Sequence, residues 1–223
     1  MAGAKDDDST DIEAVVKKFA DTMTDECAGL RKTRMDQAKK DAEKAAKGGK
    51  DDKDKKGKKD KADDPPVVTF SLDPSKETKS RTPAEQAAQV VAGRSWVCWG
   101  AHMADKARHV IMKADGKISW DAKKTMGEDF DDFKKAWARA MSKHGLKNAN
   151  GKDGWYDGDS FHLELADSKI AKTDERVKAC FEEYARLSRK ENKGSNDKFE
   201  KEYASDLKSY LEKYTPKDEA KKK

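Results

Sequence analysis

The first part of the chain carries apolar residues at helical spacing. Between residues 11 and 47, apolar side chains recur every three or four positions as far as Leu30, with polar side chains between them. Beyond Leu30 the sequence turns to Ala, Lys and Asp, which favour a helix but leave little to bury. Residues 1–47 are therefore expected to form an N-terminal amphipathic helix or arm. Its expected contact face consists of Ile12, Val16, Phe19 and Met23.

This contact face needs an apolar surface to pack against, and the pattern allows two. The helix either docks on the core of its own chain or docks on a neighbouring subunit. The two alternatives are equally compatible with the sequence. The second alternative predicts self-association through the N-terminal arm.

Residues 48–81 lack the apolar positions of a folded segment. Lys and Asp of low complexity, mixed with Gly and Pro up to Pro66, predict a disordered charged linker. Only residues 67–72, VVTFSL, form a β-type run, which Asp73 and Pro74 bring to an end. We expect this run to be an extended arm or an edge strand.

Helical patterns return at residue 82. Thr82 and Glu85 form a capping box with Pro83 at the first helical position, which predicts a helix start. This helix is expected to continue through the stretch GRSWVCWGAHM, with a break at Gly100, and to end before residues 114–117. Within GRSWVCWGAHM, the four consecutive apolar residues from Trp96 to Trp99 would then cover every side of the helix.

Three further helices are expected, over residues 125–144, 173–190 and 195–215. The first is predicted to start at a second capping box, formed by Thr125 and Glu128. The second is predicted to start at Thr173, and the third at Ser195 or Asn196. Between the first two helices, the alternating run FHLEL is either a short strand or an irregular connection.

These patterns predict an all-α fold. A compact body of four to five helices covers residues 82–215, and the N-terminal amphipathic helix is detached from it by the disordered Lys/Asp-rich linker. A basic tail follows over residues 216–223. Because 42% of residues are charged and only 35% are hydrophobic, the whole chain cannot be globular. All five tryptophans lie between residues 96 and 155, so the core is expected there.

The motifs present indicate no catalytic, cofactor or metal site. The chain has no Gly-rich phosphate-binding motif and no CxxC pair, and its four histidines lack paired ligand spacing. The Asn- and Asp-rich loop 148–159 lacks EF-hand spacing and is expected to consist of turns, with a weak cation site as the alternative. An enzyme is therefore not expected.

The three cysteines are far apart and odd in number, which indicates reduced thiols in an intracellular compartment such as the cytoplasm. No apolar run is long enough to cross a bilayer, so no membrane partner is expected. The acidic start of the chain does not resemble a secretory signal.

The charge pattern suggests nucleic acid as a partner. Residues 31–64 are rich in lysine, but nine acidic side chains are interleaved with fourteen basic ones and would weaken phosphate binding. Guanidinium groups in the body suit phosphate geometry better, and nearby aromatic side chains suit base stacking. The alternative is that these arginines lie on ordinary solvated helix faces. The candidate nucleic-acid-binding residues are Arg94, Arg108, Arg139, Arg176, Arg186 and Arg189.

Trp96 and Trp99 have two interpretations. A helix that is apolar all round is normally buried on all sides, which would place both indoles in the core. If this segment is instead peripheral, Trp96 and Trp99 form an exposed aromatic surface for a partner. The solvent exposure of Trp96 distinguishes the two interpretations.

By architectural analogy, the sequence predicts a non-enzymatic assembly protein. In this interpretation the chain is a self-associating helical subunit with a flexible charged arm, similar to a nucleocapsid or coat protein that packages RNA or other nucleic acid. It would then reside in a virus particle. The alternative is an accessory or scaffold subunit of a larger intracellular complex that binds no nucleic acid.

Overall fold

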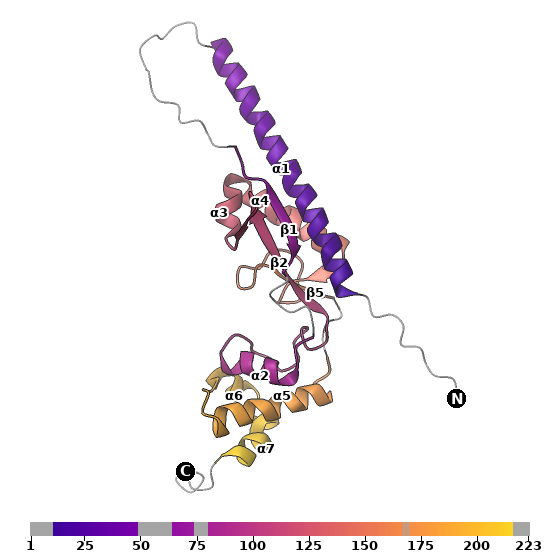
Figure 1. The fold of residues 1–223 in the computed structure, drawn as a ribbon, viewed down its shortest axis with the longest axis vertical. Coiled ribbons are helices and arrows are strands. Elements are labelled where there is room, and N and C mark those ends of the chain that lie inside the picture. Colours follow the sequence, from indigo (N-terminus) through magenta and orange to yellow (C-terminus); the bar gives the residue numbers. More distant parts are fainter. Residues whose placement is uncertain (1–10, 49–63, 74–79, 167, 169, 216–223) are drawn as a thin grey trace, which may run out of the picture. The chain divides into compact units, whose positions relative to one another are not determined.

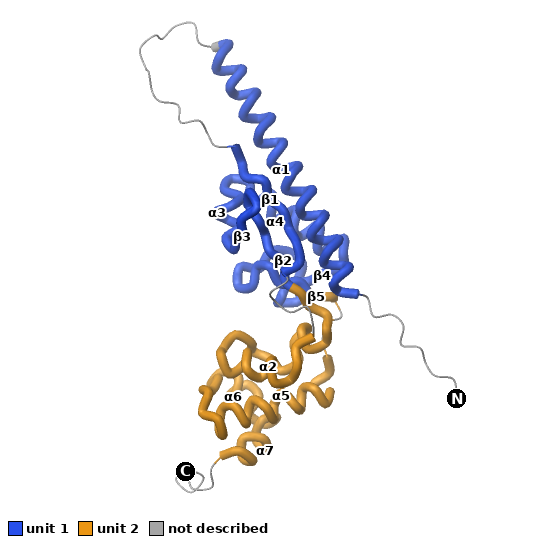
Figure 2. The backbone as a smooth tube through the Cα atoms, in the orientation of Figure 1, with its two compact units in different colours: residues 1–73, 109–163 blue, residues 74–108, 164–223 orange. Residues whose placement is uncertain are grey.

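The computed structural model describes residues 11–48, 64–73, 80–166, 168 and 170–215 (Figure 1). The chain divides into two compact units, each assembled from two separated segments (Figure 2). Unit 1 comprises residues 1–73 and 109–163, and unit 2 comprises residues 74–108 and 164–223. Most of the predicted linker and all of the predicted basic tail lie outside the described residues.

The expectation of an all-α fold is wrong, because the described residues include a five-stranded sheet. The strands are β1 (Val68–Leu72), β2 (Ala107–Ala114), β3 (Lys117–Ser119), β4 (Leu146–Lys147) and β5 (His162–Leu165). Their order is β1-β2-β5-β4, and β3 pairs with β2. Both β1 and β3 run antiparallel to β2.

The central strand β2 explains why the sheet was not predicted. Its sequence, ARHVIMKA, is largely buried on both faces, so it lacks the alternation of polar and apolar residues that identifies a half-exposed strand. The preceding helix α2 (Pro83–Val91) also ends early. Gly93 adopts a left-handed conformation with φ of +69°, which terminates the helix. The stretch GRSWVCWGAHM is therefore a loop of turns and bends.

Other local predictions are confirmed. Helix α1 (Ile12–Gly48) matches the N-terminal pattern, and β1 and β5 match VVTFSL and FHLEL. At the start of α2, Thr82 and Glu85 make both hydrogen bonds of the capping box. Asn196 caps a helix as predicted, but the single helix expected over residues 195–215 is divided at Tyr203 into α6 (Asp197–Glu202) and α7 (Ala204–Tyr214).

Two predicted helix starts are wrong. Residues 125–144 do not form one helix, because α3 (Ala122–Met126) begins at the Asp121 cap and a 3-10 turn over Gly127–Asp129 leads into α4 (Phe130–Lys143). Helix α5 (Glu175–Ala185) is capped by Asp174 rather than Thr173, and it continues as a π-helical turn over Arg186–Lys190. In both cases an Asp side chain supplies the capping acceptor.

The N-terminal helix packs on its own chain. In unit 1, α1 lies against β1 and α4 (Figure 1). The Phe19 ring meets Trp137 edge to face at 4.8 Å between centroids, and Trp137 in turn meets Trp155 at 5.1 Å. The backbone N–H of Phe70 donates to Thr24 Oγ1 at 3.0 Å, which joins β1 to α1. The core of unit 1 is therefore an aromatic cluster closed by α1.

Unit 2 has a separate helical core. Helix α2 packs on α5, and α5 packs on α7. The most deeply buried aromatic side chains there are Tyr184 and Phe199, whose rings meet at 4.9 Å. Cys98, from the loop after α2, is fully buried in the same cluster. The loop that carries Trp96 is therefore fixed to this core at Cys98.

Candidate nucleic-acid interface in unit 2

The Gln86 side chain holds the loop that follows α2. Its amide is buried and donates to Ser95 Oγ at 2.8 Å and to the Val97 carbonyl at 2.6 Å. Its Oε1 accepts a hydrogen bond from Arg81 at 2.8 Å. Because the residues on both sides of Trp96 are bonded to one buried amide, the loop has a defined path at this point.

Trp96 lies on the surface of unit 2. Its side chain is 50% exposed, and the Lys198 ammonium lies over the indole at 4.4 Å from a ring centroid. Lys198 is exposed on α6. Such a cation–π contact holds both side chains near each other while leaving them in solvent. The exposed interpretation of Trp96 therefore applies, and the buried central helix does not.

Trp99 combines a packed indole with a second lysine. The Trp99 ring meets Tyr203 edge to face at 4.8 Å and lies partly buried against the core of unit 2. The exposed Lys172 ammonium lies 4.6 Å from the Trp99 ring centroid and 5.1 Å from that of Tyr203. Each of the two tryptophans in the loop therefore makes a cation–π contact with a lysine.

Arg94 is the candidate arginine best placed for an anionic ligand. It is exposed, two residues before Trp96, and its Nε donates to the neutral Gln89 Oε1 at 2.8 Å. Within the described part of the chain, no carboxylate pairs with Arg94. Its positive charge is therefore not neutralised by an adjacent acid.

The other five candidate arginines are paired with carboxylates of this chain. Unit 2 contains four of them, and unit 1 contains the fifth, Arg139. The pairs are Arg108–Asp105, Arg176–Asp174, Arg186 with Glu183 and Glu191, Arg189–Glu200 and Arg139–Glu26. A guanidinium that already binds a carboxylate must give up that bond to bind a phosphate, which lowers the affinity it can contribute.

The N-terminal contact face is used within unit 1. Ile12, Val16, Phe19 and Met23 are each at most 3% exposed. These side chains cannot reach a second subunit unless α1 leaves β1 and α4. Of the predicted partner-binding residues, only Trp96 and Trp99 therefore remain accessible.

The Cys98 thiol is unsuited to nucleophilic chemistry. Burial raises its pKa, and the hydrogen bond with the Cys180 thiol raises it further. A thiol with a raised pKa stays protonated at neutral pH, whereas the nucleophile is the thiolate. Cys98 is a packing residue that fixes the loop to the core.

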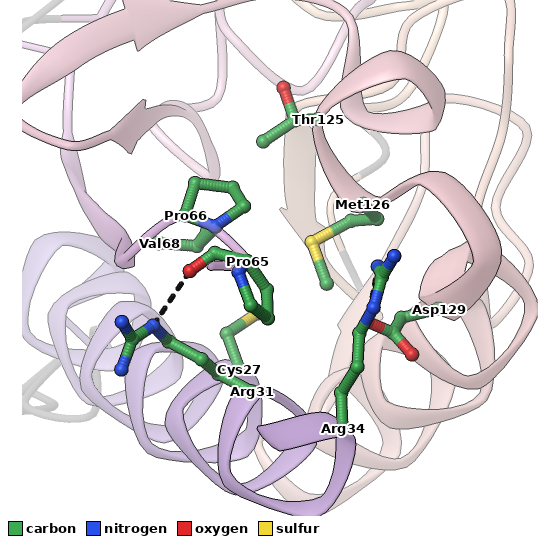
Figure 3. Close-up of a pocket in the computed structure, with 9 residues that line it drawn as sticks. All are labelled: Cys27, Arg31, Arg34, Pro65, Pro66, Val68, Thr125, Met126 and Asp129. Carbon is green, nitrogen blue, oxygen red and sulfur yellow. Dashed lines mark hydrogen bonds and ion pairs between the residues drawn. The ribbon is translucent and has the colours of Figure 1, made fainter. Parts of the chain in front are cut away.

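Unit 1 contains a small pocket between α1, residues 65–68 and α3 (Figure 3). Arg31 Nε donates to the Pro65 carbonyl at 2.7 Å, and Arg34 pairs with Asp129 at 3.3 Å. The pocket has room for about one water molecule. We interpret these contacts as packing that holds the segment before β1 against α1.

The two units differ in net charge. The segments of unit 2 contain 22 Lys and Arg against 17 Asp and Glu, whereas those of unit 1 contain 27 of each. The net charge of +5 of the whole chain therefore resides in unit 2. A positive field favours association with a polyanion at the unit that carries Trp96.

Sequence reasoning identified Trp96, Trp99 and Arg94 but missed Lys172 and Lys198. The two lysines lie more than 70 residues further along the chain than the indoles they cover. Nothing in their local sequence distinguishes them from the other lysines. Only the packing of α6 and of the segment before α5 beside the loop reveals them.

Among the described helices, none is both long enough and apolar enough to cross a membrane. Comparison of the chain with protein-family models, with curated proteins and with solved structures finds no match.

Proposed function

We propose that this chain is a non-enzymatic assembly protein that binds single-stranded nucleic acid through unit 2, with Trp96 as the residue on which a base stacks. The observation that carries this proposal is the half-exposed indole of Trp96 with Lys198 on its ring and Arg94 two residues away. Proteins that bind single strands combine an aromatic stacking surface with cations that contact the phosphates.

Two further observations support this choice. Trp96 is the only large apolar side chain classed as exposed among the described residues of unit 2. A half-exposed indole held at a fixed position is available for a base to stack on. The second observation is that unit 2 carries the net positive charge. Stacking on an indole requires an unpaired base, so the ligand is a single strand rather than a duplex.

The test is fluorescence anisotropy of a labelled 20-nucleotide RNA titrated with the full chain over a range of salt concentrations. Trp96→Ala is expected to weaken binding about 5- to 150-fold, because stacking of one base contributes about 1–3 kcal/mol. Arg94→Ala is expected to reduce the slope of log K against log salt by about 0.7.

The matched control is Trp120→Ala. Trp120 is 52% exposed but belongs to unit 1, so its loss should leave RNA affinity unchanged. If the wild-type chain does not bind RNA, or if Trp120→Ala weakens binding as much as Trp96→Ala, the proposal fails. Light scattering of the chain with and without RNA tests the assembly part. An assembly protein should form particles of several subunits on the RNA, and a one-to-one complex would contradict that role.

The second candidate function is a scaffold subunit that binds another protein rather than nucleic acid. One observation favours it: Val67, Ile118 and Trp120 are each at least 50% exposed in unit 1. Val67 bonds to Asp115 at the turn that joins β2 to β3, and β3 contains Ile118, so these two side chains come from one end of the sheet. Trp120 follows β3, and its ring meets Phe161 at 5.8 Å between centroids. If RNA binding is absent, this end of the sheet becomes the surface to test.

A further inference from the structure

Trp99 and Tyr203 form an aromatic corner in unit 2 that holds an ammonium group of the same chain. Trp99 lies in the loop after α2, and Tyr203 ends α6. Their rings are nearly perpendicular, at 89°, with 4.8 Å between centroids. The Lys172 ammonium lies 4.6 Å from the Trp99 ring centroid and 5.1 Å from that of Tyr203. One cation therefore contacts two rings that stand at right angles.

This contact differs from the other lysine–aromatic contacts of the described residues. Lys134, Lys198 and Lys213 each lie over a single ring, whereas Lys172 lies over two. A single contact of this kind is common in proteins and indicates no ligand. Several rings around one cation are the arrangement of sites that recognise quaternary ammonium groups. The aromatic corner has the beginning of that arrangement.

Both rings of the aromatic corner are fixed by the core of unit 2. Tyr203 is 8% exposed, and its ring packs on Phe199 at 5.0 Å between centroids. Trp99 packs on the same core and follows Cys98, which is fully buried. Rings that are already held in place lose little conformational freedom when a ligand binds. The aromatic corner is therefore preorganised for a ligand.

The charges beside the aromatic corner favour a cation. The Tyr203 hydroxyl donates to Glu202 Oε1 at 2.5 Å. Burial, together with the nearby carboxylates of Glu202 and Asp206, raises the pKa of Tyr203 to about 12, so the phenol stays neutral at pH 7. The two carboxylates place negative charge near the Tyr203 ring, and this charge attracts a positive ligand.

The side chain of Lys172 occupies the aromatic corner without an ion pair. Lys172 is exposed in the turn before α5, and within the described part of the chain no carboxylate pairs with it. An exposed cation–π contact shifts an equilibrium by only about 2- to 5-fold, so this side chain can move into solvent at little cost. The lysine ammonium is strongly hydrated through its three N–H donors. A quaternary ammonium has no such donors and loses less hydration when it enters between the rings.

We propose that Trp99 and Tyr203 form a binding site for a quaternary ammonium group, with Lys172 as the intramolecular occupant that the ligand displaces. The ligand carries a trimethylammonium group, either on a small molecule such as choline or on a trimethyl-lysine side chain of a peptide. This assigns a ligand to Trp99, which the sequence indicated only as a partner-binding residue. The site does not depend on base stacking at Trp96.

The test is titration of the isotope-labelled full chain with choline, followed by NMR of the choline methyl resonance and of the tryptophan indole N–H resonances. A saturable shift of the Trp99 indole resonance is expected. The uncharged tert-butyl analogue of choline has the same shape, and it should bind at least about 5-fold more weakly, because it makes no cation–π contact. This comparison uses the wild-type chain and does not depend on the folding of a variant.

Three substitutions locate the site. Lys172→Ala should strengthen choline binding about 2- to 5-fold, because it removes the competing ammonium. Trp99→Leu keeps an apolar side chain but removes the ring, and it should weaken binding at least about 5-fold. The matched control is Trp96→Leu, which should leave choline affinity unchanged because Trp96 contacts its lysine through a single ring. Circular dichroism verifies that each variant is folded.

A peptide with one trimethyl-lysine identifies the source of the group. If this peptide binds more tightly than choline and more tightly than its unmethylated form, the ligand is a protein side chain, and otherwise choline represents the ligand. Absence of a saturable shift of the Trp99 resonance with both ligands would overturn the proposal. Equal affinity for the uncharged analogue, unchanged affinity in Trp99→Leu, no gain in Lys172→Ala, or an equal loss in Trp96→Leu would each overturn it as well.

Discussion

At the scale of single residues, Asn196 connects three elements of unit 2. Its Oδ1 accepts from the Phe199 N–H at 3.1 Å and caps α6, while its Nδ2 donates to the Val90 carbonyl of α2 at 3.0 Å. Its backbone N–H donates to the Tyr184 hydroxyl of α5 at 2.8 Å. The Tyr184 hydroxyl in turn donates to Glu200 at 2.9 Å. One buried residue therefore bonds to α2, to α5 and to the start of α6.

Asn196→Ala is expected to destabilise the protein by about 1–3 kcal/mol, because it removes the cap of α6 and the side-chain hydrogen bond that joins α6 to α2. Urea denaturation followed by circular dichroism measures the change in the free energy of unfolding. Ser195→Ala is the matched control, since Ser195 is exposed and its loss should change stability by less than about 0.5 kcal/mol. Equal effects of the two substitutions would show that the Asn196 bonds contribute nothing.

At the scale of elements, α1 has two halves with different roles. Ala20 and the contact face of the first half are buried against β1 and α4. Residues 36–47 are exposed throughout. A helix whose second half buries nothing is held there by propensity and by continuity with the packed half.

Proline substitutions separate the two halves of α1. Ala20→Pro is expected to cost at least about 3 kcal/mol and to unfold unit 1, because it breaks the helix where the core depends on it. Ala42→Pro should shorten the helix and lower helical ellipticity slightly, with the thermal midpoint of unit 1 unchanged. Thermal unfolding followed by circular dichroism and tryptophan fluorescence measures both effects. A large loss of stability from Ala42→Pro would indicate that the second half is packed in solution.

The start of α5 depends on an ionised cap. Asp174 accepts hydrogen bonds from the Arg176 side chain and from the Arg176 backbone N–H, and these bonds lower the Asp174 pKa from 3.8 to about 2. A folded-state pKa below the unfolded value stabilises the folded state above about pH 4. This contribution is lost as the pH falls toward about 2.

Asp174→Asn should therefore remove a pH-dependent part of the stability while keeping a capping oxygen. The wild type is expected to be more stable than the variant near pH 5, and the difference should shrink as the pH falls from about 4 to about 2. Chemical denaturation at stepped pH values measures this difference. A difference that stays constant over that range would mean that the Asp174 charge does not stabilise the folded state.

At the scale of the whole molecule, local signals predicted local structure and little else. The capping box of Thr82 and Glu85, the apolar face of α1 and the Asn196 cap all depend on neighbouring residues, and the structure confirms them. Strand β2 was missed because burial on both faces removes the alternating pattern. Its identity as a strand depends on pairing with β1, which begins nearly forty residues earlier.

In the candidate sites, too, residues close in sequence could be predicted to lie together, whereas residues distant in sequence could not. Trp96 and Arg94 lie two residues apart, so the sequence alone could single them out together. Lys198 reaches the Trp96 ring only because α6 packs beside the loop after α2. Trp99 and Tyr203 meet only because the same loop packs against the end of α6, a contact that no spacing along the chain records.

The division of each unit into two segments determines how the protein can be dissected. A fragment that starts at residue 82 would contain β2 and α4 but would lack α1 and β1, which pack against them. A fragment that ends at residue 163 would lack α5, α6 and α7, on which the loop with Trp96 rests. No single cut therefore yields an intact unit. Experiments on one unit require point substitutions in the full chain, or a rearranged chain that joins residue 108 directly to residue 164.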